Sequence, residues 1–249
     1  MTRRRRALAL ALAIGGLAMP TALRAEPLVA DLTSHLIGIT GGFTGTSVVL
    51  FGATDGPGDI VVVVRGPDHD IVVRRKRRVA GIWVNSKEEA FGDVPSFYSI
   101  ASSRPLDGIA TPGVLAFQQL GLDNVRLTPT RGPMRDEDVP FRDALIRSQQ
   151  RENLFGTGTG KVEFLGDRLF RTTLAFPSNV PVGTYLVDVF LIRNKAVVAG
   201  QTTPLVISKI GVDAEVYDLA DRQAAIYGVV AVVAAMMAGW LGSIPFRHA

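Results

Sequence analysis

Short apolar runs alternate with turn-forming residues along most of the chain. In its first half, runs rich in Val and Ile cover residues 36–40, 47–51, 60–65, 71–75, 79–84 and 97–101. Glycine, proline and aspartate separate several of them, as at residues 55–58 and 66–68. Short β-branched runs bounded by such residues predict strands, and at this spacing they favour a sandwich or barrel over a parallel α/β sheet. The continuous apolar run at residues 60–64 predicts a strand that is covered on both faces.

Helical periodicity replaces this pattern in the middle of the chain. Residues 112–122 and 140–154 have helical character, and the second segment places Phe141, Ala144 and Leu145 on one face, with Ser148 beside them. Strand patterns then return at residues 161–165, 169–176, 184–192, 196–199 and 204–208. The segment 193–195 predicts a hairpin turn between two of these strands.

A proline-containing corner at residues 177–183 leads into a strand that carries Tyr185. This layout is common in extracytoplasmic β-sandwich modules, where the tyrosine packs at the corner. The predicted fold class is mainly β: an exported, Ig-like β-sandwich ectodomain. Two arrangements are open, because the β-rich regions at 26–110 and 156–212 can form two lobes joined by a partly helical connection at 111–155, or one long interleaved sandwich.

Residues 1–25 have the features of a secretory signal peptide. Four arginines at positions 3–6 precede an apolar stretch at 7–18, and Ala25 is a small residue before a cut at Glu26. An uncleaved anchor is the alternative. Either form directs the residues that follow it out of the cytoplasm.

Residues 224–244 form an uncharged apolar run near the C-terminus. A helix of about 20 residues is long enough for the hydrocarbon core, so we predict a transmembrane helix; a buried helix of a soluble domain is the alternative. Residues 213–223 become a juxtamembrane segment and 245–249 a cytoplasmic tail, since Arg247 follows the positive-inside rule. The predicted location is the inner membrane, with a single pass and a periplasmic N-terminal domain.

The predicted membrane helix carries small residues at a helical spacing. They are Gly228, Ala231, Ala235, Gly239 and Gly242. This spacing allows another helix to approach closely, which predicts self-association or docking of an inner-membrane protein partner. The alternative is the ordinary abundance of Ala and Gly in membrane helices.

Composition narrows the classes of partner. The chain has 27 Lys+Arg against 23 Asp+Glu, but five of the arginines lie in residues 1–25, and without that segment the balance is close to neutral. A nucleic-acid partner is therefore not expected, while the lipid bilayer is. The chain has no cysteine, which excludes disulfides and thiolate sites.

Five consecutive cations at residues 74–78 are the most unusual feature of the ectodomain. Side chains alternate faces along a strand, so the five cannot all point one way, and some must pair with acids or lie at a strand end or hairpin. The candidate ligand-binding or partner-binding residues are Arg74, Arg75, Arg77, Arg78 and Trp83. A solvated strand edge is the plainer explanation; the functional ones are lipid headgroups, an acidic partner surface, or a small oxyanion such as sulfite or sulfate. Residues 86–98 predict a loop whose Phe and Tyr pack against the core.

Other candidate chemistry is weak, so no catalytic residue, metal or cofactor is expected. Asp68-His69-Asp70 follows Gly-Pro and predicts a solvated turn rather than a metal site. His35 lies beside Ser34, but a serine triad needs an Asp–His–Ser geometry that sequence does not show. The segment 156–161 resembles a phosphate loop, but Phe155 stands where that motif needs glycine. It predicts a flexible turn before a strand.

Several segments of the sequence match a known family. They lie at residues 34–40, 43–46, 50–52, 59–67, 74–85, 94–98, 179–185, 227–228 and 238–240. The chain resembles the alphaproteobacterial putative transmembrane protein family over nearly all of its mature length, most specifically at 34–98. The resemblance implies an exported ectodomain with a C-terminal membrane helix and no known catalytic residues. It also implies a partner of the sulfite-exporter type, because members are encoded beside such membrane proteins.

The predicted function is therefore that of a non-enzymatic, membrane-anchored periplasmic accessory or scaffold protein that assists a transporter. Two alternatives remain open at this point. One is a module that binds or senses a small oxyanion through the arginines. The other is an envelope hydrolase that uses His35 or His69.

Overall fold

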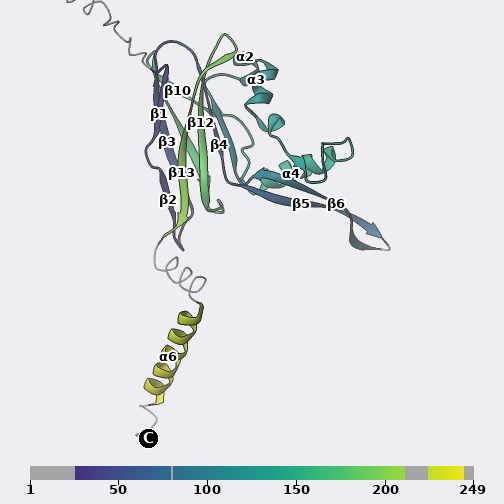
Figure 1. Ribbon diagram of the computed structural model, residues 1–249, viewed down its shortest axis with the longest axis vertical. Helices are drawn as coiled ribbons and strands as arrows, with labels where there is room; N and C mark the ends of the chain where they lie inside the picture. The colour runs from purple at the N-terminus through teal and green to yellow at the C-terminus, as the bar shows by residue number, and fades with distance from the viewer. Residues whose placement is uncertain (1–25, 80, 211–223, 244–249) are drawn as a thin grey trace, which may run out of the picture.

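The computed structural model of the protein describes residues 26–79, 81–210 and 224–243 (Figure 1). The predicted signal peptide at 1–25, juxtamembrane segment at 213–223 and cytoplasmic tail at 245–249 lie outside the described residues. The described part is mainly β, as the sequence predicts, and its strands form three sheets.

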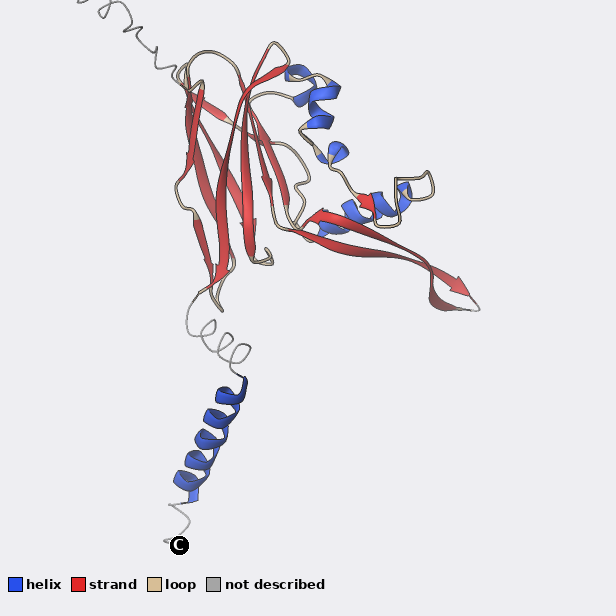
Figure 2. Cartoon of the chain, in the orientation of Figure 1, coloured by secondary structure: helices blue, strands red, loops and turns tan. Residues whose placement is uncertain are grey.

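Two of the sheets face each other as a sandwich (Figure 2). The first has the strand order β1 (Leu28–Leu32), β3 (Gly45–Thr54), β11 (Leu169–Pro177) and β10 (Glu163–Leu165). The second has the order β2 (Leu36–Ile39), β13 (Ala196–Lys209), β12 (Gly183–Arg193), β4 (Asp59–Arg65), β7 (Tyr98–Ser102) and β9 (Gly160–Lys161). The two outer pairs of this second sheet, β2 with β13 and β7 with β9, are parallel, and the other pairs in both sheets are antiparallel.

The two β-rich regions of the sequence are interleaved in these sheets. Strand β11 pairs with β3, and β12 lies between β4 and β13. The region predicted as a second lobe therefore completes both sheets of the first one. The prediction of two separate lobes is wrong, and the alternative of one interleaved sandwich describes the pairing. Adjacent strands that are distant in sequence bury a common core, which neither region could close alone.

Strand β4 is buried on both faces, as its continuous apolar run predicts. Ile60, Val62 and Val64 belong to the core between the two sheets, whereas Val61 and Val63 belong to a second core on the other side. All five are fully buried. The second core is covered by α2 (Leu106–Ile109), α3 (Pro112–Phe117), the 3₁₀ helix η1 (Leu122–Asn124) and α4 (Val139–Arg151). Figure 1 shows α2 and α3 on the β4 side of the sandwich and α4 beside β5.

The third sheet is built on a long hairpin. It has the order β5 (Asp68–Val79), β6 (Ile82–Pro95) and β8 (Thr128–Pro129). Two predictions are wrong here. The run at 79–84 is not one strand, because the chain reverses between β5 and β6, and residues 86–95 are not a loop, because they form the return strand. Their many charged residues lie on an exposed hairpin and so do not prevent pairing. Asp68-His69-Asp70 is exposed as predicted but begins β5 rather than forming a turn.

Two turns are as predicted. Arg193 ends β12 and Ala196 begins β13, with Asn194 and Lys195 both at positive φ. That pair of conformations matches the twist of a two-residue hairpin. The Tyr185 side chain is fully buried at the predicted corner, and its hydroxyl donates to the Pro181 carbonyl at 2.6 Å.

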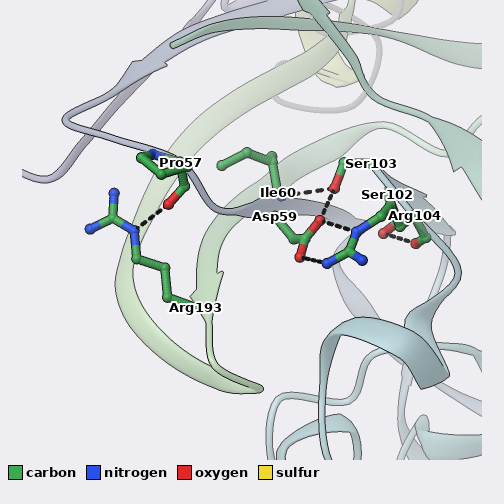
Figure 3. A network of polar contacts seen from close by, with 7 residues as sticks. All are labelled: Pro57, Asp59, Ile60, Ser102, Ser103, Arg104 and Arg193. Carbon is green, nitrogen blue, oxygen red and sulfur yellow. Dashed lines mark hydrogen bonds and ion pairs between the residues drawn. The ribbon is translucent and has the colours of Figure 1, made fainter. Parts of the chain in front are cut away.

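A polar network closes one end of the second sheet (Figure 3). Asp59, at the start of β4, accepts hydrogen bonds from the Arg104 guanidinium and from the Ser103 hydroxyl, and Arg193 Nε donates to the Pro57 carbonyl at 2.8 Å. The Arg104 hydrogen bond is the main cause that lowers the pKa of Asp59; burial opposes it, and the Ser103 hydroxyl lowers the pKa further. The network joins the end of β7 to the start of β4.

The C-terminal segment folds as helix α6 (Ala224–Ser243). Residues 228–229 and 232–240 of this helix are exposed. Within the described residues, no helix is long and apolar enough to cross a membrane.

Candidate functional site

The β5–β6 hairpin projects from the sandwich, and it carries the cationic run and Trp83 that the sequence singles out (Figure 2). The strands pair in antiparallel register from Asp68↔Pro95 to Val79↔Ile82. Gly81 has a φ of +85°, a left-handed conformation that glycine adopts without strain. Because the two strands stay paired from Asp68 to Val79, the hairpin extends well beyond its apolar base on the body of the protein.

The base of the hairpin is anchored in the second core. Phe91 and Val94 of β6 are fully buried, while Ile71 and Val73 of β5 pack against the same cluster. Arg75 extends its guanidinium over the ring of Phe141 in α4, with Cζ 5.0 Å from the ring centroid. This cation–π contact helps to fix the hairpin against the helix.

A buried ionic clamp holds the same region. The Arg131 guanidinium lies 2.6 Å from Glu89 Oε2 and 2.6 Å from Asp138 Oδ1, and both carboxylates are buried. Burial alone would raise the pKa of Asp138, but the Arg135 backbone N–H and the Arg131 guanidinium together lower it. Asp138 thus stays ionised at neutral pH, and the clamp joins β6 to the start of α4.

A β-bulge changes the direction of the distal half. Arg75 pairs with Lys87 and Lys76 with Asn85, so Ser86 is the extra residue of β6. Its hydroxyl donates to the Arg75 carbonyl at 3.1 Å. A bulge increases the local twist of a strand pair, so the end of the hairpin points in a different direction from its base.

The end of the hairpin exposes large apolar side chains. Ile82 is 68% exposed, Trp83 66% and Val84 41%. A soluble surface usually scatters such residues singly, and three in succession at a projecting end indicate a contact surface. We call this set, together with Lys76, Arg77 and Arg78, the hairpin tip.

The predicted site residues divide between the two faces of the hairpin. Arg78 lies opposite Trp83 in register, and Arg74 shares their face, where its Nε is 3.0 Å from Glu88 Oε2. By strand alternation Arg75 and Arg77 lie on the other face. The structure therefore brings Arg78 and Trp83 together and does not bring the four arginines to one point. The pairing of Arg74 with an acid agrees with the prediction.

Charge at the tip is unbalanced. Among the described residues, no carboxylate lies within 4.0 Å of the Lys76, Arg77 or Arg78 side chains. Arg78 Nε donates to the Gly81 carbonyl at 3.3 Å. The tip is therefore cationic as well as apolar. Sequence reasoning missed Ile82 and Val84, and Gly81 between two β-branched runs was the signal for a turn that would have placed them at an end.

The histidines do not form a hydrolytic arrangement in the described residues. His35 Nε2 lies 2.9 Å from Asp31 Oδ1, and both side chains are more than half exposed. The neighbouring Ser34 hydroxyl donates to the Leu36 carbonyl at 2.7 Å instead of to an imidazole. His69 is the second residue of β5, and no three His, Asp or Glu side chains of the described part are grouped to hold a metal ion.

Another cavity lies at the end of the second sheet, near the network of Figure 3. It has a volume of about 620 Å³ and is lined by residues 156–161, together with Arg104 and Asp123. The glycine-rich segment forms one wall and then enters β9 at Gly160, so it precedes a strand as predicted. Arg104 in this lining is paired with Asp59, and Lys161 lies 4.0 Å from Glu163.

The small residues predicted to pack the membrane helix all lie within α6. At Gly228 and Gly239, a Cβ added to the backbone would meet nothing within 4 Å. Both positions are therefore open to the approach of another helix.

A family model described as "Putative transmembrane protein (Alph_Pro_TM)" matches residues 27–248, which include both the hairpin and α6. A comparison with curated proteins found no match.

Proposed function

The chain belongs to the putative transmembrane protein family Alph_Pro_TM, and from this premise we propose that it is a non-enzymatic, membrane-anchored accessory protein that docks its hairpin tip on an acidic surface of an inner-membrane partner. The observation that carries the proposal is the tip itself. It combines exposed Ile82, Trp83 and Val84 with three cations at the end of a rigidly anchored hairpin.

The residue types of the tip suit a binding surface. Tryptophan and arginine supply most of the binding energy in many interfaces, and here Arg78 lies opposite Trp83. Cations without an acidic partner in the described part of their own chain attract an acidic surface at long range and select it over a basic one. The second core and the Arg131 clamp hold the base in place, so little ordering entropy is lost when the tip binds.

The membrane anchor is part of the proposal. The anchor is proposed from the sequence and not from the described helices: residues 224–244 carry no charged side chain, over a length that suits a single pass of the hydrocarbon core. The family description supports a membrane protein. The signal-like segment at 1–25 and Arg247 after the run support a single pass with the sandwich in the periplasm and the C-terminus in the cytoplasm.

We further propose that the sandwich is of the Ig-like kind. Two packed sheets with an interleaved strand order and a tyrosine corner at Tyr185 support this assignment. Ig-like modules commonly present binding residues at the margins of a rigid framework, which is where the hairpin leaves the sheet.

A site-specific cross-link tests the docking proposal. The full chain, expressed in bacterial inner membranes, carries benzoylphenylalanine in place of Ile82, or in place of the exposed Val182 as a matched control. We expect the Ile82 probe, and not the Val182 probe, to give a defined adduct with one integral membrane protein. Adding Trp83→Ala to the Ile82 probe should reduce that adduct about tenfold, because a central aromatic contact is lost. Adducts with lipid alone, or an adduct insensitive to Trp83→Ala, would contradict the proposal.

The small residues of α6 give a second prediction. Gly239→Leu is expected to weaken co-purification of two differently tagged copies from detergent extracts about tenfold, because a bulky side chain separates closely packed helices. Val233→Leu adds bulk on another face of the helix and should leave co-purification unchanged. Equal recovery with both variants would show that this face is not used for self-association.

A further inference from the structure

One end of the sandwich is closed by connections that carry no charged side chain. Residues 40–44 join β2 to β3, and residues 178–182 join β11 to β12. Neither connection contains an Asp, Glu, Lys or Arg residue. The two connections lie side by side, because β3 and β11 pair from Gly45↔Pro177 onward. We call them, together with Ile210, the uncharged end.

The uncharged end exposes apolar side chains. Val182 is 48% exposed and Ile210 44%, while Phe43 is half-buried against the core between the two sheets. Charged residues border this surface: Lys209 ends β13, and Asp68 begins β5. An exposed apolar surface with a polar rim is typical of a contact with a protein or a membrane.

The opposite end of the same sandwich is charged. Three of its connections each contain a charged residue: residues 55–58, 166–168 and 194–195. Arg193 pairs there with Asp55, and Arg104 pairs with Asp59 in the network of Figure 3. The sandwich therefore runs from a charged end to an uncharged one, which indicates that its two ends meet different surroundings.

The chain leaves the sandwich at the uncharged end on its way to the proposed membrane anchor. The Ile210 N–H donates to the Ile39 carbonyl at 2.9 Å, which fixes this exit beside the connection 40–44. Residues 211–223 then join Ile210 to α6, and a connection of this length spans no more than about 45 Å even when fully extended. The opposite end lies about 35 Å farther along β12, so turning it towards the bilayer would use most of that reach. The uncharged end is therefore the one held near the lipid.

We propose that the uncharged end rests on the phospholipid surface beside the anchor, with Phe43, Val182 and Ile210 in the headgroup region. The inference rests on the proposed membrane anchor and adds a lipid contact of the folded body to it. The exposed backbone groups of the two connections limit the depth of this contact, because unpaired N–H and C=O groups are costly in hydrocarbon. Since neither connection carries a carboxylate, an anionic bilayer does not repel them.

This placement also sets the height of the β5–β6 hairpin above the membrane. The hairpin begins directly after Pro67, and a Cβ added to Gly183 at the start of β12 would lie 2.7 Å from the Pro67 ring. Figure 1 accordingly shows the hairpin leaving the sandwich near the lower end of β12. With the uncharged end on lipid, the hairpin starts close to the membrane surface, within reach of the extramembrane surface of an integral membrane protein.

Fluorescence quenching in lipid discs tests the proposal. The chain has no cysteine, so a single introduced cysteine carries the only label, here the fluorophore NBD. The label is placed through Val182→Cys, or through Asp167→Cys at the opposite end as the matched control. The full chain is reconstituted, one copy per disc, in phosphatidylcholine and phosphatidylglycerol that contain a lipid with a nitroxide on its headgroup. We expect the nitroxide to quench NBD at position 182 at least about threefold more strongly than at position 167.

A charge placed in the contact gives the sharpest variant. A Cβ at Gly42 would meet nothing within 4 Å, so Gly42→Asp fits the connection and puts a carboxylate against the lipid. It should lower the quenching at position 182 about threefold. Gly158→Asp is the matched control, because a Cβ there also meets nothing within 4 Å but the residue lies in the segment before β9, beside the end of β7. It should leave the quenching unchanged.

The outcomes separate this inference from the docking of the hairpin tip. Trp83→Ala should leave the quenching at position 182 intact. Equal quenching at both label positions, or no effect of Gly42→Asp, would overturn the lipid contact and leave the anchor in place. Quenching at position 182 that requires two copies in a disc would show that a second chain covers this end, which also overturns the proposal. A chain that is not recovered with the discs would overturn the anchor and the lipid contact together.

Discussion

Tyr98→Phe is expected to lower the free energy of unfolding of the full chain by about 2–3 kcal/mol. The Tyr98 side chain is almost fully buried, and its hydroxyl makes two hydrogen bonds: it donates to the Gln119 carbonyl at 2.8 Å and accepts from the Gly121 N–H at 2.8 Å. Phenylalanine keeps the ring contacts but leaves both backbone groups without a partner. These bonds hold the chain between α3 and η1 against β7, so their loss loosens the layer that supports the hairpin base.

Urea denaturation followed by circular dichroism measures this loss. Tyr185→Phe is the matched comparison, because Tyr185 is equally buried but its hydroxyl donates to one carbonyl only. Its expected cost is about 1 kcal/mol. If the Tyr98 variant is no less stable than the Tyr185 variant, the Gln119 carbonyl and the Gly121 N–H form hydrogen bonds with water in place of the lost hydroxyl.

The same hydroxyl predicts a dependence on alkaline pH. Burial raises the pKa of Tyr98 to about 12, although the Gly121 N–H and the charge of Arg65 offset part of this effect. The folded state therefore disfavours the phenolate relative to an unfolded chain, in which tyrosine titrates near pH 10. The Tyr98 contribution is fully present below about pH 10 and is lost as the pH rises towards 12. Tyr98→Phe should flatten this decline, and an unchanged slope would contradict the assignment.

Arg65→Met is the second large expected effect, a loss of about 2–4 kcal/mol. Arg65 Nη2 lies 2.6 Å from Asp188 Oδ2, and the Thr202 hydroxyl donates to Asp188 Oδ1 at 2.6 Å. Asp188 is buried on the central strand β12. Removing the guanidinium takes away the charge that balances the buried Asp188 carboxylate, while the hydrogen bond from the Thr202 hydroxyl remains. The estimate is reduced from that of a fully buried pair because a quarter of the Arg65 side chain reaches solvent.

A double-mutant cycle separates the ion pair from its surroundings. Asp188→Leu in the Arg65→Met background removes the isolated charge and should recover most of the lost stability. Arg126→Met, at an exposed position, should change the free energy of unfolding by less than about 0.5 kcal/mol. If Arg65→Met and Arg126→Met have equal effects, the pair does not stabilise the centre of the sheet.

The strands were predictable wherever the local pattern was unambiguous. The run at 60–65 is β4, and the turn before Ala196 is a hairpin turn, because β-branched residues and turn-forming residues act over a few positions. The β5–β6 hairpin was predicted poorly because it lacks such a local pattern. The cationic run and the charged residues at 86–95 have no apolar alternation, and what pairs them is a register set by Phe91 and Val94 in a distant core.

The candidate site shows the same limit. The cations and Trp83 could be singled out from composition alone, since such a cluster is unusual in any strand. Their division between two faces, the exposure of Ile82 and Val84, and the Arg131 clamp depend on the bulge at Ser86 and on a contact between β6 and the segment before α4. No pattern within one segment encodes these long-range contacts.

The amino-acid order alone determined the family, the β-rich class, the corner at Tyr185 and the uncharged C-terminal run, since each depends on neighbouring residues or on a continuous match. Only the tertiary structure decided that β11, β12 and β13 complete the sheets begun by β1–β4, that the cations lie on a projecting hairpin, and that β5 has a free edge. Strand pairing and burial are set by residues far apart in the chain, which approach one another only when the common cores close.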